Sequence, residues 1–352
     1  MTEACIRAVV ESVHSSSNQA VLYLAGGASL VIGWLLSVPG ASNTVLETVV
    51  PYSRMSMIQL LGKIPARFCS QQTAEEMALL SYNRALKLSR PGYPVVGLGF
   101  TGSLASTSPK LGDHRFCLST RTADWLWVST VTLSKGLRTR EQEDKVSSHI
   151  LLKAMANACG VTATFDTGLT ESDVSDECEK YFDEDQQLEQ LINGQICFKI
   201  YPFPSDTNTS SSERKIILSG SFNPLHDGHL KLLEVAASIC GDGYPCFEIS
   251  AVNADKPPLS VSQIKDRVKQ FEKFGKKPKY YDGNYKKMLE ILLGCKNTGC
   301  TFLVGGRNVD GTFKVLEDLD IPEELRDMFI SIPEERFRMD ISSTEIRKSL
   351  RI

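Results

Sequence analysis

The stretch Ile216–His229, IILSGSFNPLHDGH, decides the fold of the carboxyl-terminal half of this chain. An apolar run typical of a buried parallel strand leads into a turn of small residues, and the apolar stretch LKLLEVAASIC then predicts a helix. Gly220 and Ser221 let the backbone approach a phosphate closely, and free N–H groups at a helix start attract anions. Open α/β folds bind ligands at the carboxyl ends of their strands. We therefore expect an α/β domain with a phosphate-binding turn here.

Two histidines stand where this helix begins. His226 and His229 lie three residues apart, and both would add side-chain donors facing the turn. Taken alone, such a pair is usually two surface or core histidines, and less often half of a metal site. A motif of this kind gains meaning only from its structural context. Here the preceding strand and turn supply that context.

A second motif, DISSTEIR, spans Asp340–Arg347. It predicts a helix start, with Ser342 or Ser343 as the cap and Glu345 in the first turn. Taken alone, it would indicate an ordinary capped helix.

Together the two motifs resemble the nucleotidyltransferase superfamily, whose members carry the strand, the turn, His-x-Gly-His and Ile-Ser-Ser-Thr-x-Ile-Arg. The chain is most similar to the nicotinamide mononucleotide (NMN) adenylyltransferases. The resemblance implies a Rossmann-like α/β/α domain with a parallel sheet, in which His226 and His229 are catalytic and stabilise the transferred and leaving phosphates. The implied nucleotide-binding residues are Gly220, Ser221, Phe222, Asn223, Lys256, Arg307, Ser342, Ser343, Thr344 and Arg347.

Two of these residues also have simpler interpretations. Lys256 follows the predicted strand Phe247–Ser250 and would contact phosphates by resemblance, but it could equally be a solvated loop lysine. Arg307 follows the glycines of TFLVGGRN and would lie over the triphosphate. A salt-bridge role is an equal alternative for this arginine.

The implied reaction is adenylyl transfer, in which a mononucleotide phosphate attacks the α-phosphorus of ATP and pyrophosphate leaves. Positioning and charge stabilisation dominate such transfers, so the motifs need no nucleophile. Mg²⁺ is expected on the ATP phosphates, with no dedicated protein metal site. The expected partners are ATP and a mononucleotide. With a net charge of −3 we expect no nucleic acid, and a homo-oligomer is left open.

The transferase region is shorter than in its relatives. Between Phe274 and Met288 there is no apolar strand, although NMN adenylyltransferases carry a third strand and a substrate segment there. This gap indicates a variant lacking an internal segment, and losing a central strand would leave ladder groups unpaired. The phosphopantetheine adenylyltransferases span a comparable distance, so length alone does not exclude a complete site.

Three functions therefore stay open. The first is an NMN adenylyltransferase that makes NAD. The second is a related transferase acting on another phosphate substrate, such as a pantetheine-phosphate or choline-phosphate enzyme. The third is a catalytically impaired nucleotide-binding protein or regulatory pseudoenzyme.

The amino-terminal half has a resemblance of its own. The segments GGASLVIGWLLSVPGAS, VVPYS and GLGFTGSLASTSPK resemble the CinA C-terminal family of nicotinamide-nucleotide amidohydrolases. Ser42 and Tyr52 match the nucleophile and tyrosine of that family by spacing. Met57 replaces the expected lysine, and Leu22–Ala25 replaces a Glu-Ser-x-Thr run. A serine without a base is a poor nucleophile. We expect a degenerate domain retained for structure, pairing or nucleotide sensing.

Along the chain, apolar strands alternate with helical stretches from about residue 21 to 132, which indicates an α/β layer fold. A helix is predicted over Glu141–Ala158. The acidic run Glu171–Glu189 is typical of a solvated helix face or loop, and Gln195–Phe203 predicts a strand. The predicted domains are a CinA-like α/β domain at 1–165, an acidic segment, strand and polar linker at 166–213, and the nucleotidyltransferase domain at 214–352.

The apolar segment Ala20–Val38 resembles a membrane span, but three glycines interrupt it and no basic region precedes it. A buried strand, a glycine turn and a buried helix are expected instead. The ten cysteines are scattered without zinc-ligand spacing. They predict reduced thiols in a cytoplasmic or nuclear protein.

Overall fold

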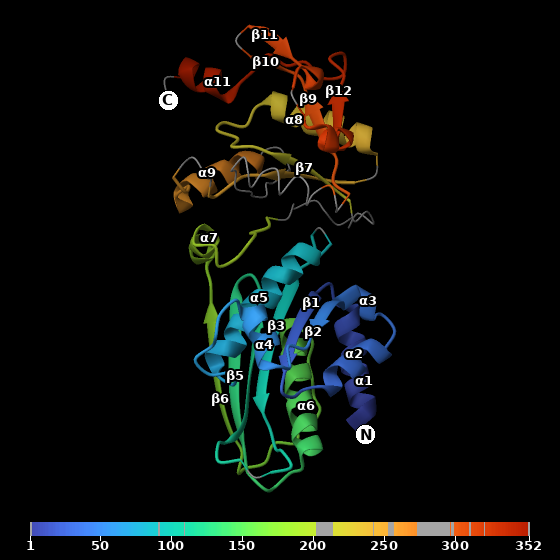
Figure 1. The fold of residues 1–352 in the computed structure, drawn as a ribbon, viewed down its shortest axis with the longest axis vertical. Coiled ribbons are helices and arrows are strands. Elements are labelled where there is room, and N and C mark those ends of the chain that lie inside the picture. Colours follow the sequence, from blue (N-terminus) through green and yellow to red (C-terminus); the bar gives the residue numbers. More distant parts are fainter. Residues whose placement is uncertain are drawn as a thin grey trace. The chain divides into compact units, whose positions relative to one another are not determined.

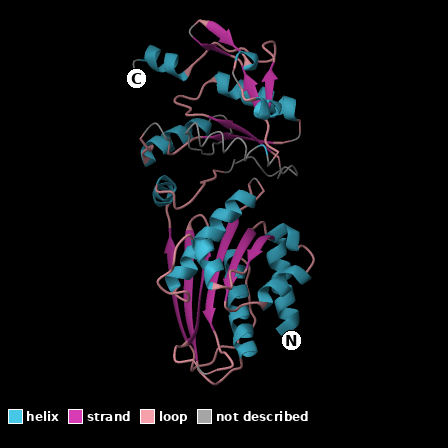
Figure 2. Ribbon diagram, in the orientation of Figure 1, coloured by secondary structure: helices cyan, strands magenta, loops and turns pink. Residues whose placement is uncertain are grey.

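The computed structural model describes residues 2–90, 92–108, 110–201, 214–241, 243–252, 257–272, 296, 299–309, 311–319 and 321–350. The chain divides into two compact units, Met1–Phe198 and Lys199–Ile352 (Figure 1). Each unit combines helices and strands (Figure 2), which confirms the predicted α/β class. Within the described ranges, the helices are all too short or too polar to span a bilayer.

The first unit is built on one mixed six-stranded sheet with strand order β2-β1-β3-β4-β5-β6. β1 pairs in parallel with both β2 and β3, and the remaining neighbours are antiparallel. The strands are β1 (Gln19–Ala25), β2 (Val45–Val49), β3 (Val95–Ser103), β4 (His114–Arg121), β5 (Trp125–Leu133) and β6 (Val174–Tyr181). The β4–β5 hairpin is a feature that the predicted alternation of strands and helices did not include.

Helices cover both faces of this sheet, which makes a three-layer arrangement (Figure 1). One face carries α5, and the other packs against α1, α2 and α6. The helices of this unit are α1 (Thr2–Ser15), α2 (Leu30–Ser37), α3 (Ala41–Thr44), α4 (Arg54–Leu61), α5 (Gln71–Leu88), α6 (Arg140–Ala158) and α7 (Glu184–Ile192).

Two glycines in β3 bring α5 directly onto the sheet. A Cβ atom added at Gly97 would lie 2.4 Å from the carbonyl oxygen of Ala78, and one at Gly99 would lie 2.3 Å from that of Ala74. Side chains at these positions would push the helix away from the sheet. The glycines of GLGFTG are therefore explained by close helix–strand packing.

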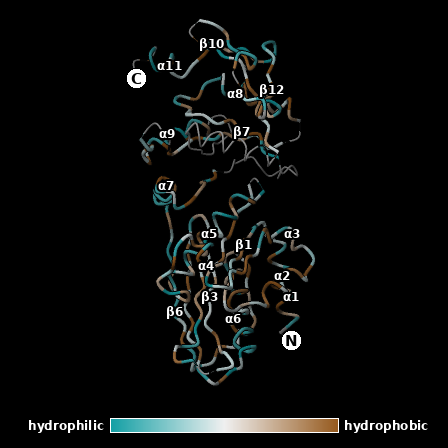
Figure 3. Tube along the Cα trace, in the orientation of Figure 1, coloured by the Kyte–Doolittle hydropathy of each residue, from teal (hydrophilic) through white to brown (hydrophobic). Residues whose placement is uncertain are grey.

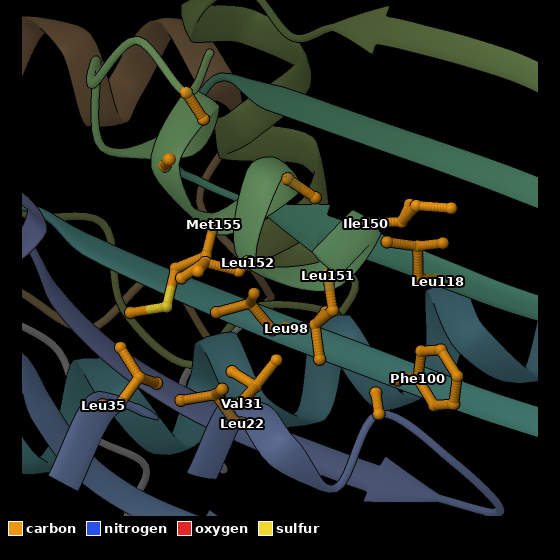
Figure 4. Close-up of a cluster of buried hydrophobic side chains, with 14 of the residues drawn as sticks. Leu22, Val31, Leu35, Leu98, Phe100, Leu118, Ile150, Leu151, Leu152 and Met155 are labelled. Atoms are coloured by element: carbon orange, nitrogen blue, oxygen red, sulfur yellow. The ribbon is translucent and has the colours of Figure 1, made fainter. Parts of the chain in front are cut away.

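The alternate residues of the same strand point into the main core. Leu98 and Phe100 are fully buried and lie among Leu22, Val31 and the α6 residue Leu151 (Figure 4). Successive strand residues point to opposite faces of the sheet. The glycines of β3 therefore face α5, and its large side chains pack into this core.

The apolar segment Ala20–Val38 lies inside this unit. It forms β1, a turn at Gly26 and Gly27, and α2, as predicted. Every residue of β1 is buried, so its hydrophobicity is explained by packing. Figure 3 shows hydrophobic colour along α2 and the inner strands of this unit.

The region after α6 differs from two expectations. The end of the acidic run lies in helix α7, in line with the expected helix, but residues 174–181 form the edge strand β6, whose side chains are all exposed. Pairing with β5 therefore overrides the polar composition. Residues 195–201 form no strand. Part of this backbone is instead bound by Asn83 of α5, whose Nδ2 donates to Gln195 O at 2.8 Å and whose Oδ1 accepts from Cys197 N at 2.8 Å.

The second unit contains two separate parallel strand pairs within its described part, β7–β8 and β12–β9. Helix α8 packs between apolar clusters that include Leu233 on one side and Val235 on the other. The elements are β7 (Lys215–Ser219), α8 (Asp227–Cys240), β8 (Tyr244–Glu248), α9 (Val261–Glu272), β9 (Phe302–Gly305), β10 (Arg307–Val309), β11 (Thr312–Lys314), η1 (Leu316–Asp318), η2 (Glu323–Met328), β12 (Phe329–Ile332) and α11 (Ser343–Leu350).

This unit has the predicted parallel strand pairing and the predicted strand–turn–helix order. The prediction that residues 274–288 lack a strand falls outside the described residues. The same is true of the polar linker predicted at 205–213.

Candidate functional site

The turn after β7 is fixed to the neighbouring strand β8. Gly220 N donates to the carbonyl oxygen of Glu248 at 2.8 Å, and Ser219 Oγ donates to the Glu248 carboxylate at 2.6 Å. The parallel register of β7 and β8 places Ser219 opposite Glu248. The pairing of β7 with β8 therefore ends at Ser219 and Glu248, and the turn begins at Gly220.

Phe222 anchors the middle of this turn. Its backbone has φ of +43°, a region that residues other than glycine seldom adopt. Its side chain is fully buried, with ring centroids 5.4 Å from Phe247, 5.3 Å from Phe271 and 4.9 Å from His229. The aromatic packing compensates the cost of the backbone conformation and places one histidine against the core.

The side chain of Gln270 in α9 binds the backbone of the same turn. This residue was not predicted from the sequence. Its Nε2 donates to Phe222 O at 3.1 Å, and its Oε1 accepts from Leu225 N at 2.8 Å. One amide therefore satisfies both a carbonyl and an N–H of an irregular loop. Gln270 lies 45 residues beyond Leu225 in the chain, and no local pattern marks it.

His226 and His229 form a stacked pair at the start of α8. Their ring centroids are 3.7 Å apart with an interplanar angle of 24°. His226 N donates to His229 Nδ1 at 3.3 Å, so this nitrogen carries no proton in the neutral ring. The neutral His229 must then hold its proton on Nε2, which makes Nε2 a donor.

Burial lowers the pKa of both histidines. The pKa of His229 falls to about 4. Burial is the largest cause of this shift, and the charges of His226 and Arg307 lower the pKa further. Burial also lowers the pKa of His226; the charge of Arg307 adds to this, while that of Asp227 opposes it. Both rings are therefore neutral donors near pH 7 in the absence of an anion, and the positive charge of Arg307 acts on this site.

The first turn of α8 has donors available. Among the described residues, the backbone N–H groups of Asp227 and Gly228 have no hydrogen-bond acceptor. Gly228 is buried, and a Cβ atom there would lie 2.9 Å from Ile341 Cγ2 and 3.1 Å from His226 Nδ1. The two open N–H groups at the start of this 14-residue helix favour an anion.

The second motif meets the first at this turn. Ser343 Oγ donates to Pro224 O at 2.8 Å, and Arg347 Nη1 donates to Asn223 O. The Arg347 guanidinium also donates to Thr344 Oγ1 at 3.1 Å. The structure therefore brings together two segments that lie more than 100 residues apart in the chain.

The remaining predicted residues take several positions. Ser342, not Ser343, caps α11, since its Oγ accepts from Glu345 N at 3.2 Å. Ser221, Asn223 and Arg307 have exposed side chains, with Arg307 at the start of β10. Lys256 lies outside the described residues.

A cavity of about 460 Å³ lies beside α8, between Asp227 and Lys231 on the helix and the segment Glu334–Met339. Within the described residues, no group of three or more His, Cys, Asp or Glu side chains is placed to hold a metal ion.

The first unit has a larger cavity of about 760 Å³ at the end of β1, where Gly26, Gly27, Tyr52 and Arg140 contribute to its wall. The predicted serine position, Ser42, is exposed on α3 and is not part of that wall. Met57 is buried at 3% exposure, so this side chain serves the core.

The start of helix α2 beside this cavity is closed by side chains of α6. Ser29 Oγ donates to Asp144 Oδ2 at 2.7 Å, and Ser29 N donates to Asp144 Oδ1 at 3.3 Å. Two serines of α6 bind the neighbouring N–H groups: Ala28 N donates to Ser147 Oγ at 3.1 Å, and Leu30 N donates to Ser148 Oγ at 3.3 Å.

Residues 217–349 match the family model described as Cytidylyltransferase-like. This part of the chain is therefore a domain of the nucleotidyltransferase superfamily, and it includes both histidines and the DISSTEIR motif. No curated protein is significantly similar to the chain.

The amino-terminal region resembles solved structures of the CinA superfamily. The competence/damage inducible protein CihA from Agrobacterium tumefaciens is 19% identical, covers 45% of this chain and 95% of its own, and has a TM-score of 0.35. A competence or damage-inducible protein from Enterobacter asburiae is 15% identical, covers 45% of this chain and 99% of its own, and has a TM-score of 0.37.

Proposed function

We propose that the second unit transfers an adenylyl group from ATP to nicotinamide mononucleotide, giving NAD and pyrophosphate. The cytidylyltransferase-like match supports a nucleotidyltransferase-type activity for residues 217–349. The choice of ATP and NMN rests on the sequence resemblance. The observation that carries the proposal is the junction at the turn, where Ser343 and Arg347 bind the backbone beside the stacked histidines.

In this proposal the triphosphate lies at the start of α8. The open N–H groups of Asp227 and Gly228 and the Nε2 proton of His229 supply donors for phosphate oxygens. Arg307 and Arg347 add positive charge at the same edge. Ser343 and Arg347 position the turn from the other side.

The chemistry needs no protein nucleophile. A phosphate oxygen of the acceptor forms a bond to the α-phosphorus of ATP, and the bond to the pyrophosphate oxygen breaks. His229 stabilises charge that develops on the phosphates during this exchange. Mg²⁺ enters with ATP and would be held chiefly by phosphate oxygens.

The first unit is proposed to be a non-hydrolytic partner domain. Ser42 lies away from the cavity wall, and a buried methionine stands at the position of the expected lysine. Neither residue supplies an activated nucleophile. The prediction is that residues 1–200 release no ammonia from NMN.

A second function is nucleotide binding without turnover. It is favoured by the two separate strand pairs that the described part of the second unit shows. A complete Rossmann-like sheet would join them.

The test is NAD and pyrophosphate formation by the purified full chain with ATP, Mg²⁺ and NMN. Nicotinate mononucleotide, phosphopantetheine and a His229→Ala variant are run in parallel. NAD that disappears in the variant supports the proposal. Product only from another acceptor would overturn the NMN assignment. ATP binding with no product from any acceptor would favour the second function.

A further inference from the structure

Two cysteines of the first unit meet on the sheet face that carries α5. Cys117 lies in β4 directly opposite Thr101 of β3, and Cys69 lies just before α5. Cys69 Sγ donates to Thr101 O at 3.5 Å and to Arg115 O at 3.6 Å, alternatives for one proton. Its sulfur therefore lies against the β3–β4 strand pair where Thr101 is opposite Cys117, two residues along β4 from Arg115.

The backbone on both sides of this contact is fixed. Thr101 Oγ1 donates to Phe68 O at 2.6 Å, which ties the segment before α5 to β3. Thr130 of β5 lies opposite Cys117, and its Oγ1 donates to Cys117 Sγ at 3.5 Å. The sheet therefore fixes the positions of both cysteines on the face that carries α5.

We propose that Cys69 and Cys117 are an oxidisable dithiol, which a small peroxide converts into a disulfide joining the segment before α5 to β4. Cys117 is 1% exposed, whereas Cys69 is half-buried. A disulfide needs the two sulfurs to close to about 2.05 Å.

The reaction balances with hydrogen peroxide as the oxidant. The Cys117 thiolate attacks one peroxide oxygen, the O–O bond breaks, and a sulfenic acid and hydroxide form. The hydroxide takes up a proton and becomes water. The Cys69 sulfur then attacks the sulfenic sulfur, the S–O bond breaks, and the leaving hydroxide takes the Cys69 proton. In total two thiols and one peroxide give one disulfide and two waters.

The surroundings favour Cys117 as the thiolate. The neighbouring Cys69 thiol lowers the pKa of Cys117; burial opposes this, while the Thr130 hydroxyl and the charge of Arg115 assist. The same contact, followed by burial, raises the pKa of Cys69. Cys159 is a useful contrast, because burial raises its pKa to about 11. A buried thiol with a high pKa should react slowly.

The experiment treats the folded full chain with hydrogen peroxide, blocks free thiols with iodoacetamide and digests with trypsin. Cleavage after arginine places Cys69 in peptide 68–84 and Cys117 in peptide 116–121, each as the single cysteine. Mass spectrometry should find these two peptides joined, and dithiothreitol should separate them. Cys159 in the same sample should be recovered alkylated after unfolding.

The controls are Cys69→Ser and Cys178→Ser, the second removing an exposed thiol of β6. The joined peptides should be lost in the first variant and kept in the second. Recovery of Cys69 and Cys117 as free thiols at the level of Cys159 would overturn the proposal. Joined peptides that pair Cys69 or Cys117 mainly with other cysteines would also overturn it. Both of these overturning outcomes are measured on the parent chain without substitutions, so the test remains valid even if a variant fails to fold.

Discussion

Each unit contains a parallel strand, a turn with glycine and a helix start, but the two helix starts are satisfied in different ways. In the first unit, Asp144 and two serines of α6 occupy the N–H groups at the start of α2. In the second unit, the N–H groups of Asp227 and Gly228 have no acceptor among the described residues, and neutral histidines stand beside them. The comparison teaches that the same local topology can be closed by the protein itself or left for an anionic ligand.

The largest expected effect is on His229. His229→Ala should lower the rate of pyrophosphate release about 10²–10³-fold, because a donor aimed at developing phosphate charge is lost. His229→Asn should lose the same activity, although its side-chain oxygen can still accept from His226 N. Steady-state kinetics of correctly folded variants measure this. Near-normal turnover in both variants would remove His229 from catalysis.

Removing the link between the two motifs should have the next largest effect. Arg347→Ala should lower kcat/KM for the nucleotide about 10- to 100-fold, since the charge beside the phosphates and the bond to Asn223 O are lost together. Lys348→Ala, an exposed neighbour, is the matched control and should stay close to the parent. Equal effects of both substitutions would show that only net charge matters.

Gln270 should act by positioning. Gln270→Leu leaves Phe222 O and Leu225 N unpaired, and a fall in kcat of about 10-fold is expected. Gln270→Glu, which keeps the acceptor for Leu225 N, should recover part of the loss. Lys269→Ala on the same helix is the control. A pure loss of thermal stability with unchanged kcat would contradict the positioning role.

The histidine pair also predicts a pH effect on stability. The pKa of His229 is lowered to about 4 in the folded chain, below the value of about 6.5 in an unfolded one. The unfolded state therefore binds the proton more tightly, and stability is complete above pH 6.5 and is lost as the pH falls toward 4. After allowance for solvent screening, the loss is about 1–2 kcal/mol. Urea unfolding of the parent and of His229→Asn between pH 4 and 7 measures the difference; identical profiles would contradict the lowered pKa.

The smallest effect is expected in the first unit. Asp144→Ala removes the side chain that closes the start of α2 and should lower the free energy of unfolding of this unit by about 1 kcal/mol. Nucleotide transfer should not change. Lys145→Ala, an exposed neighbour, serves as the control. A fall in transfer activity in Asp144→Ala would show that the closed turn takes part in catalysis.

The sequence predicted what local patterns encode. The order of strand, turn and helix around Gly220, and the helix start at Ser342, follow from apolar spacing and capping residues. The contacts of Gln270 with the turn and of Ile341 with Gly228 are long-range and have no local signal. The β6 strand was missed because its side chains are all exposed and only its pairing with β5 defines it.

The most direct test follows the five histidine ring C2–H signals of the full chain by NMR while Mg²⁺ and ATP are added. The predicted result is that the His226 and His229 signals shift and the pKa of His229 rises, because an anion now stabilises its charged form. The signals of His14, His114 and His149 in the first unit should stay in place. Shifts confined to those three histidines, or no shift at saturating ATP, would contradict a triphosphate site at the start of α8.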